Sequence, residues 1–272
     1  MDSRLQRRIQ RYGWDKAASH YEASWHEQLA PAQVRLLEMA QLRENDRVID
    51  VACGTGIVTL AAAALVGPGG HVLGTDISEG MIALAHPRAE SAPADVRFER
   101  MDAEDLQVSE SSFDAALCAL GLMYVPDPRK ALGEMLRALR PGGRAVAAVW
   151  GQRDRCGWAE IFPIVDARVK SEVCPLFFGL GTADSLQREF ARAGFAELSS
   201  VRLQTQLRYS GPEDACDAAF VGGPVALAYS RFDAAVRDSA RAEYLASIAP
   251  YLNGSGYAIP GEFVVTSGRK PD

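Results

Sequence analysis

The nine residues VIDVACGTG, at positions 48–56, decide the fold of this chain. A short apolar run containing Asp50 leads into Gly54 and Gly56, and an alanine-rich apolar segment follows. Glycines at such a place allow a tight turn and the close approach of a ligand to the backbone. The segment therefore predicts a buried strand that passes through a glycine-rich turn into a helix.

The same alternation continues outward as far as residue 150. The runs that predict strands are largely apolar rather than strictly alternating, which is typical of a parallel sheet covered on both faces. Pro141-Gly142-Gly143 is expected to end the last intervening helix. The predicted strands span 47–52, 71–75, 95–99, 113–119 and 143–150, and the predicted helices span 56–66, 79–86 and 128–139. This order is typical of repeated strand–helix–strand units.

The flanking regions carry helical patterns. Residues 12–40 predict two helices broken near Pro31, with one apolar face. That face consists of Trp14, Ala17, Ala18, Tyr21 and Trp25. Further elements are helices at 157–169 and 182–193, strands near 197–207 and 261–267, and an insertion at 209–257 with helical character at 232–248. An insertion of this length beside a sheet edge is typical of a lid or a binding element.

Composition excludes several classes of protein. The chain has 272 residues, a net charge of −6, 48% apolar and 24% charged residues, which is a globular composition. The one dense basic cluster is Arg4, Arg7, Arg8 and Arg11, so a nucleic-acid substrate is disfavoured. The longest apolar stretch, 57–66, is too short to span a bilayer, and no apolar signal core follows the basic start, so we expect a cytoplasmic protein without a membrane span.

The five cysteines, Cys53, Cys118, Cys156, Cys174 and Cys216, show no CxxC pair and no metal-ligand spacing. We expect reduced thiols and no bound metal.

The glycine turn differs from a dinucleotide-binding loop. In one register a GxGxxG pattern would need a glycine where Ala52 stands, and in the other a glycine where Thr59 stands, so NAD is disfavoured. Asp76 lies 20 residues beyond Gly56, at the end of the second predicted strand, where a carboxylate can accept the hydroxyls of a ribose. The pattern indicates a nucleoside cofactor without a pyrophosphate.

Five segments in this order and spacing resemble class I S-adenosylmethionine-dependent methyltransferases, in particular the small-molecule group that includes the ubiquinone and menaquinone methyltransferases. They are VIDVACGTG (48–56), VLGTDISEGMIALA (72–85), RFERMDAEDL (97–106), FDAALCALGLMYVPDP (113–128) and LRALRPGGRAVAAVW (136–150). The resemblance implies an α/β, Rossmann-like sheet of seven strands, six parallel and the last antiparallel, with helices on both faces. It would comprise a helical cap (1–40), a cofactor-binding core (41–208), a helical lid (209–257) and a last core strand (258–272).

The resemblance also implies the cofactor contacts. The loop with Ala52, Gly54 and Gly56 would lie along the methionine portion of S-adenosylmethionine. Asp50 would orient the loop and the amino group, and Asp76 would take the ribose. The remaining contacts implied are Ile77 and Met81 against adenine, Asp102 and Ala103 at its edge, Ala119 near the methionine end, and Tyr21 closing over the cofactor.

Catalytic residues are harder to assign. Quinone methyltransferases often carry histidines where this chain has Met123 and Tyr124, so Tyr124 and Tyr21 are the candidates and no general base stands out. His20 and His26 lie off the Tyr21 face of a helix, while His71 and His86 suit structural or capping roles. The aromatic residues Trp150, Trp158, Phe162, Phe177 and Phe178 are expected to form either core or an acceptor cavity.

The expected activity is in-line methyl transfer to a small, apolar or aromatic acceptor, in a protein that can form a homodimer. Two alternatives stay open. One is a cofactor-binding relative with different chemistry, because the family histidines are missing. The other is a cofactor-binding protein without catalysis, which would lack an enclosed acceptor cavity.

Overall fold

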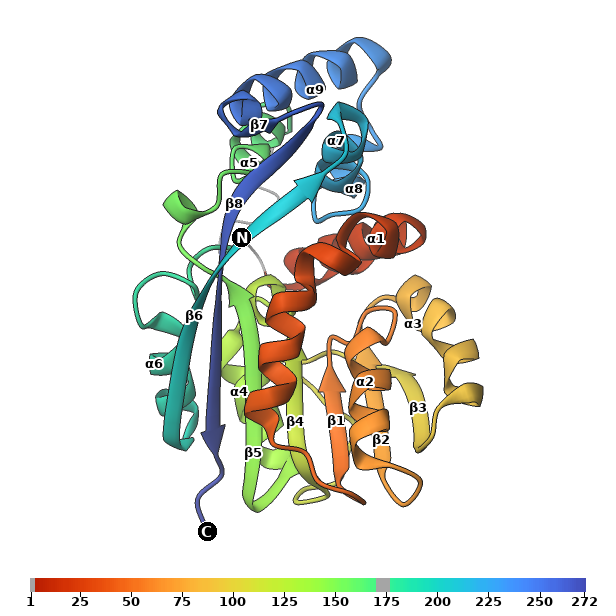
Figure 1. The fold of residues 1–272 in the computed structure, drawn as a ribbon. Coiled ribbons are helices and arrows are strands. Elements are labelled where there is room, and N and C mark those ends of the chain that lie inside the picture. The colour runs from red at the N-terminus through yellow and green to blue at the C-terminus, as the bar shows by residue number, and fades with distance from the viewer. Residues whose placement is uncertain (1–2, 170–176) are drawn as a thin grey trace.

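A central sheet dominates the computed structural model, which describes residues 3–169 and 177–272 (Figure 1). Its strand order is β3-β2-β1-β4-β5-β8-β6, and the short β7 pairs with β8 off this path, so the sheet has eight strands where seven were expected. Strands β1 to β5 run parallel, and β8 pairs antiparallel with both β5 and β6, so β8 alone runs against the others. The bounds are β1 Arg47–Val51, β2 His71–Asp76, β3 Asp95–Arg100, β4 Phe113–Ala119, β5 Leu139–Trp150, β6 Ala196–Tyr209 and β8 Gly256–Arg269. The Rossmann-like α/β fold is thus confirmed.

Helices cover both faces of the sheet. In the view of Figure 1, α2 and the lower part of α1 lie in front of the strands and α4 lies behind them. The helices that cover the two faces are α1 Ser3–Ala40, α2 Ile57–Val66, α3 Glu79–Ala85, α4 Pro128–Ala138 and α6 Ser185–Ala193. Local sequence sets their ends: Asp127 caps α4 by accepting from the Lys130 amide at 3.1 Å, and Gly194 ends α6 in the left-handed conformation.

The N-terminal segment is one helix, so the predicted break near Pro31 is wrong. Helix α1 runs for 38 residues with Pro31 inside it. Proline removes one amide donor and disturbs the preceding turn, and it commonly bends a helix without ending it. The upper and lower parts of α1 run in clearly different directions in Figure 1. Packing along the length of the helix keeps it continuous, since Trp25, Leu29, Ala32 and Leu36 are all buried.

Three other predicted boundaries also differ. Strand β5 begins at Leu139 and includes Pro141-Gly142-Gly143, because Gly142 donates to the Lys270 carbonyl beyond β8. The predicted helix at 157–169 is only α5 Ile161–Asp166 within the described residues. The antiparallel pair β6 and β8 is longer than expected, with 14 residues in each strand.

Between β6 and β8 the chain forms α7 Pro212–Phe220, α8 Ala226–Tyr229, α9 Ala234–Ile248 and the short strand β7 Leu252–Asn253. The outer ends of β6 and β8 carry these elements beyond the main sheet, next to the upper part of α1 (Figure 1). Gly13 of α1 lies close to the insertion: a Cβ on this glycine would be 3.9 Å from the Pro224 carbonyl oxygen.

Cys53, Cys118, Cys156 and Cys216 are free thiols, while Cys174 lies outside the described residues. Within the described ranges, no helix has the length and apolarity needed to cross a bilayer.

Leu36 offers a test of how α1 is held. Its side chain is fully buried, whereas Val34 on the same helix is 55% exposed. We expect Leu36→Ala to lower the free energy of unfolding by about 2–5 kcal/mol, because a cavity is added to the lost burial. Urea unfolding followed by circular dichroism measures the change. Val34→Ala is the matched control, and an equal loss in both variants would contradict the packing described here.

Candidate cofactor and acceptor site

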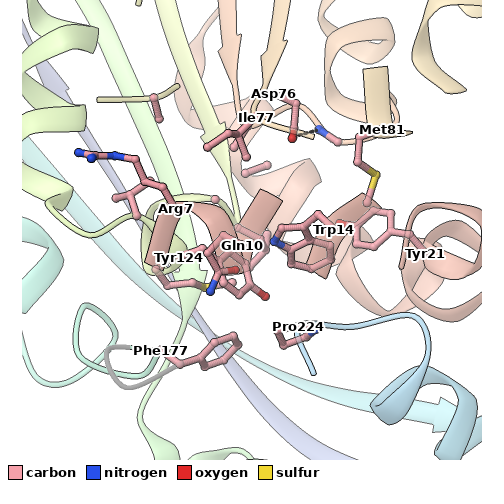
Figure 2. A pocket seen from close by; sticks show the side chains of 18 of the residues that line it. Arg7, Gln10, Trp14, Tyr21, Asp76, Ile77, Met81, Tyr124, Phe177 and Pro224 are labelled. Atoms are coloured by element: carbon pink, nitrogen blue, oxygen red, sulfur yellow. Dashed lines mark hydrogen bonds between the residues drawn. The ribbon is translucent and has the colours of Figure 1, made fainter. Parts of the chain in front are cut away.

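The main cavity lies where the C-terminal ends of β1, β2 and β4 meet beneath α1. It encloses about 980 Å³ of empty space, part of which is open to solvent. In Figure 2, Asp76, Ile77 and Met81 lie on one side of the cavity, and Phe177 and Pro224 lie on the other. Ligands bind at this edge of open α/β sheets because the strand order reverses there.

The glycine turn shapes the floor of the cavity. Ala52, Gly54 and Gly56 all have positive φ, at 57°, 57° and 87°. Gly54 and Ala52 line the cavity, whereas Gly56 lines neither the main cavity nor the hollow next to it. A Cβ at Gly56 would lie only 2.7 Å from the ring of Phe98, so this glycine is needed for close packing of the turn.

Asp76 connects the glycine turn to the next helix. One carboxylate oxygen accepts from the Gly54 amide and the other from the Ser78 amide, both at 2.9 Å. Burial raises the pKa of Asp76 to about 6, although these two hydrogen bonds oppose the shift. Each oxygen keeps a lone pair that can accept a further hydrogen bond from a ligand in the cavity.

Asp50 is fully buried at the end of β1 and lines the hollow on the other side of the glycine turn. Its Oδ2 accepts from the Thr59 hydroxyl at 2.6 Å, but its Oδ1 has no partner. Burial, together with the nearby charge of Asp76, raises the pKa of Asp50 to about 7. A buried oxygen without a donor is costly, and a ligand ammonium group would satisfy it. The unpaired carboxylate oxygen of Asp50 therefore fits the ammonium group in the amino-acid tail of S-adenosylmethionine.

The opposite end of the cavity suits a flat base. Ile77, Met81, Ala103 and Asp102 line it, as does Met101. The sequence did not predict Arg7 as a residue of this site. Its Nε lies 3.0 Å from the Asp102 carboxylate, and its guanidinium also pairs with the buried Glu104. These ion pairs hold the start of α1 against the loop after β3.

Helix α1 forms the roof of the cavity. Asp15 accepts from the Ser78 hydroxyl at 2.6 Å and from the Gly80 amide at 3.0 Å, which fastens α1 to the start of α3. Tyr21 lines both the main cavity and the hollow that holds Asp50. Burial strongly raises the pKa of Tyr21, so its hydroxyl stays protonated at neutral pH. Arg7, Gln10, Trp14 and Tyr21 share one face of α1, so the three- and four-residue spacing of the predicted stripe could have revealed Arg7 and Gln10.

Aromatic side chains enclose the remaining part of the cavity. The Trp150 and Trp158 rings lie 4.7 Å apart, and Trp158 lies 5.6 Å from Phe177. Tyr124 contacts Trp14 at 5.0 Å and Phe177 at 5.5 Å. The wall is completed by Trp25, Leu29, Met123 and Pro224, while Phe162 and Phe178 pack behind it and do not line the cavity.

No described histidine lines the cavity. His20, His26 and His86 are exposed, and His71 lies 3.0 Å from the Asp95 carboxylate at the far ends of β2 and β3. The described residues also contain no group of three or more side chains suited to holding a metal ion.

Comparison with known proteins agrees with this geometry. Residues 48–143 match the model of a methyltransferase domain. A demethylmenaquinone methyltransferase from Symbiobacterium thermophilum is 29% identical over 216 residues, which cover 68% of this chain and 83% of that relative. One from Clavibacter sepedonicus is 44% identical over 102 residues, which cover 38% of this chain and only 40% of the relative. The solved YcgJ protein from Bacillus subtilis shares the fold, with a TM-score of 0.64 at 19% identity over 89% of this chain and 99% of its own.

The methyltransferase-domain match and the named relatives indicate a methyltransferase that uses S-adenosylmethionine, and the fold and the cavity agree with this. Within that class, the chain resembles the quinone-type methyltransferases.

The ribose assignment of Asp76 can be tested by calorimetry with S-adenosylhomocysteine. We expect Asp76→Ala to weaken binding by about 1.5–3 kcal/mol, because charge-assisted hydrogen bonds to a ligand are lost. Asp95→Ala, at the exposed start of β3, is the control and should bind normally. Wild-type affinity in the Asp76 variant would show that the ribose contact lies elsewhere.

The raised pKa of Asp50 predicts that cofactor binding depends on pH. Only the ionised carboxylate attracts the ligand ammonium, and this form is lost as the pH falls through about 7. We expect S-adenosylhomocysteine to bind about fourfold more weakly at pH 6.5 than at pH 8. Methylthioadenosine, which lacks the ammonium group, and the Asp50→Asn variant should not show this dependence on Asp50. The same pH profile in the variant would contradict the assignment.

Proposed function

We propose that this chain transfers a methyl group to a small, apolar, aromatic acceptor bound between α1, the end of β5 and the insertion. The observation that carries the proposal is the aromatic wall that continues the cofactor cavity. Trp25, Trp150 and Trp158 bring large apolar surfaces to a ligand. The names of the relatives support an aromatic acceptor as well, since both are demethylmenaquinone methyltransferases.

The bound cofactor supplies an electrophilic methyl group on a sulfonium. The chain positions both reactants and excludes water. Asp50 holds the amino-acid end of the cofactor and Asp76 its ribose, while the aromatic wall aligns the acceptor and keeps water out. Alignment of this kind supplies much of the rate of a displacement. Tyr21 stays protonated and closes over the cofactor, so it donates a hydrogen bond and does not act as a base.

Tyr124 is the ionisable side chain placed among the aromatic residues of the described wall. Since no described histidine reaches this part, we infer that the acceptor brings a nucleophile that is already reactive near neutral pH. Tyr124 would contact the acceptor and orient it.

The reaction is tested with deuterium-labelled S-adenosylmethionine and an organic extract of apolar metabolites. Mass spectrometry should find a labelled product that partitions into the organic phase. We expect Trp158→Ala to lower kcat/KM for that acceptor at least tenfold, with little change in cofactor affinity, whereas Phe178→Leu, behind the wall, should have a small effect. Label found only in water-soluble products would argue against the apolar acceptor.

Closure by α1 gives a further prediction. We expect Tyr21→Ala to reduce turnover strongly, because water then reaches the site. His20→Ala and His26→Ala, on exposed positions of the same helix, should keep near-normal rates. Loss of turnover in either histidine variant, with folding and cofactor binding intact, would identify a general base and overturn this assignment.

A further inference from the structure

The first three turns of α1 present a second face, next to the one that covers the cavity. Leu5, Arg8 and Tyr12 follow helical spacing on this face and are exposed, with 36% of Leu5 and 48% of Tyr12 accessible. The Arg11 guanidinium lies 5.6 Å from the centre of the Tyr12 ring. We call the side formed by Leu5, Arg8, Tyr12 and the partly exposed Arg11 the outer face of α1.

The charge of this segment is opposite to that of the chain. Residues 1–16 contain five arginines and lysines and two aspartates, a net charge of +3 in a chain with a net charge of −6. Arg8 makes no ion pair with any residue that the structure describes. Arg100 is the last residue of β3. The guanidinium groups of Arg11 and Arg100 each lie 3.7 Å from the carboxylate of Glu79, which is itself exposed. These cations are therefore available to an external anion.

A hollow joins the outer face to the cofactor cavity. It holds about 740 Å³ of empty space, part of it open to solvent, and its lining residues are Arg7, Arg8, Arg11, Tyr12 and Arg100, together with Ile77, Met101 and the carboxylate of Asp102. Arg7, Ile77, Met101 and Asp102 line both this hollow and the main cavity. The basic hollow thus opens directly beside the site.

We propose that the outer face of α1 docks on the surface of an anionic lipid bilayer. Arginines next to exposed apolar and aromatic side chains on one helical face are the pattern of a helix that lies in a membrane interface. Arg8, Arg11 and Arg100 meet the headgroup phosphates, while Leu5 and Tyr12 enter the boundary between headgroups and acyl chains. A nucleic acid would use the arginines, but it would leave this apolar pair in water.

Docking also explains why one helix carries both surfaces. Trp14 and Tyr21 line the cavity from the same helix whose outer face meets the bilayer. An apolar acceptor partitions into lipid, so a helix that touches the bilayer brings the cavity close to its source. This last step rests on the proposed function, whereas the docking surface itself does not.

Vesicle co-sedimentation of the full chain, without acceptor, tests the proposal. We expect binding to vesicles of phosphatidylcholine with one-third phosphatidylglycerol, weakening as salt is raised, and little binding to phosphatidylcholine alone. Since no turnover is measured, failure of the proposed reaction would leave this result unchanged. Equal binding to both vesicles, or binding to neither, overturns the proposal, as does tight binding of duplex DNA without binding to vesicles.

Variants locate the surface. Arg8→Glu should weaken vesicle binding at least about tenfold, because a charge that favours binding is reversed. Leu5→Ser combined with Tyr12→Ser should weaken it severalfold with the charges kept. Arg231→Glu, an exposed arginine of the insertion, is the matched control and should bind as wild type. Calorimetry with S-adenosylhomocysteine should give normal affinity in all of them, which separates lost docking from misfolding. Wild-type vesicle binding by Arg8→Glu overturns the proposal.

Discussion

Two buried carboxylates at the ends of neighbouring parallel strands determine the organisation of this protein. Asp50 is the penultimate residue of β1 and Asp76 is the last residue of β2, and burial raises the pKa of both. Asp76 is stabilised by the amides of Gly54 and Ser78, whereas one oxygen of Asp50 has no partner. Burying such charges is costly unless a ligand compensates them. The glycine turn, the hollow beside Asp50 and the roof above them surround the cavity in which we propose that a cationic, ribose-bearing cofactor supplies this compensation.

The two halves of helix α1 have different functions and are held by different kinds of contact. Its C-terminal half packs on the sheet through side chains such as Leu36, which are fully buried. Its N-terminal half covers the site and is held by polar contacts: Arg7 to Asp102 and Glu104, and Asp15 to Ser78 and Gly80. Glu104 and Ser78 are buried, so these contacts fix the N-terminal half of α1 over the site through groups that solvent does not reach.

The acceptor half of the cavity gains its character from segments far apart in the sequence. Trp25 comes from α1, Trp150 from the end of β5, Trp158 from the segment after it and Pro224 from the insertion. Their rings contact each other at angles and distances typical of favourable aromatic pairs. Such a wall presents a large apolar surface to a ligand, which suits the proposed reaction because it depends on alignment more than on proton transfer.

Local patterns in the sequence determined the parallel sheet and the glycine turn, and they placed Asp76 at the end of a strand, because strand, turn and helix signals depend on neighbours close in the chain. They also indicated the apolar stripe of α1. The resemblance to methyltransferases added Asp50, Ile77 and Met81 as expected cofactor contacts. Only the tertiary structure decided that Pro31 lies inside one helix, that Gly56 packs on Phe98 and not along a cavity, and that Arg7 reaches Asp102. Only the tertiary structure also decided which aromatic residues form the wall, since Trp158 faces the cavity while Phe178 lies behind it. These outcomes depend on contacts between segments distant in sequence, whose packing overrides local preference and leaves no periodic signal in the chain.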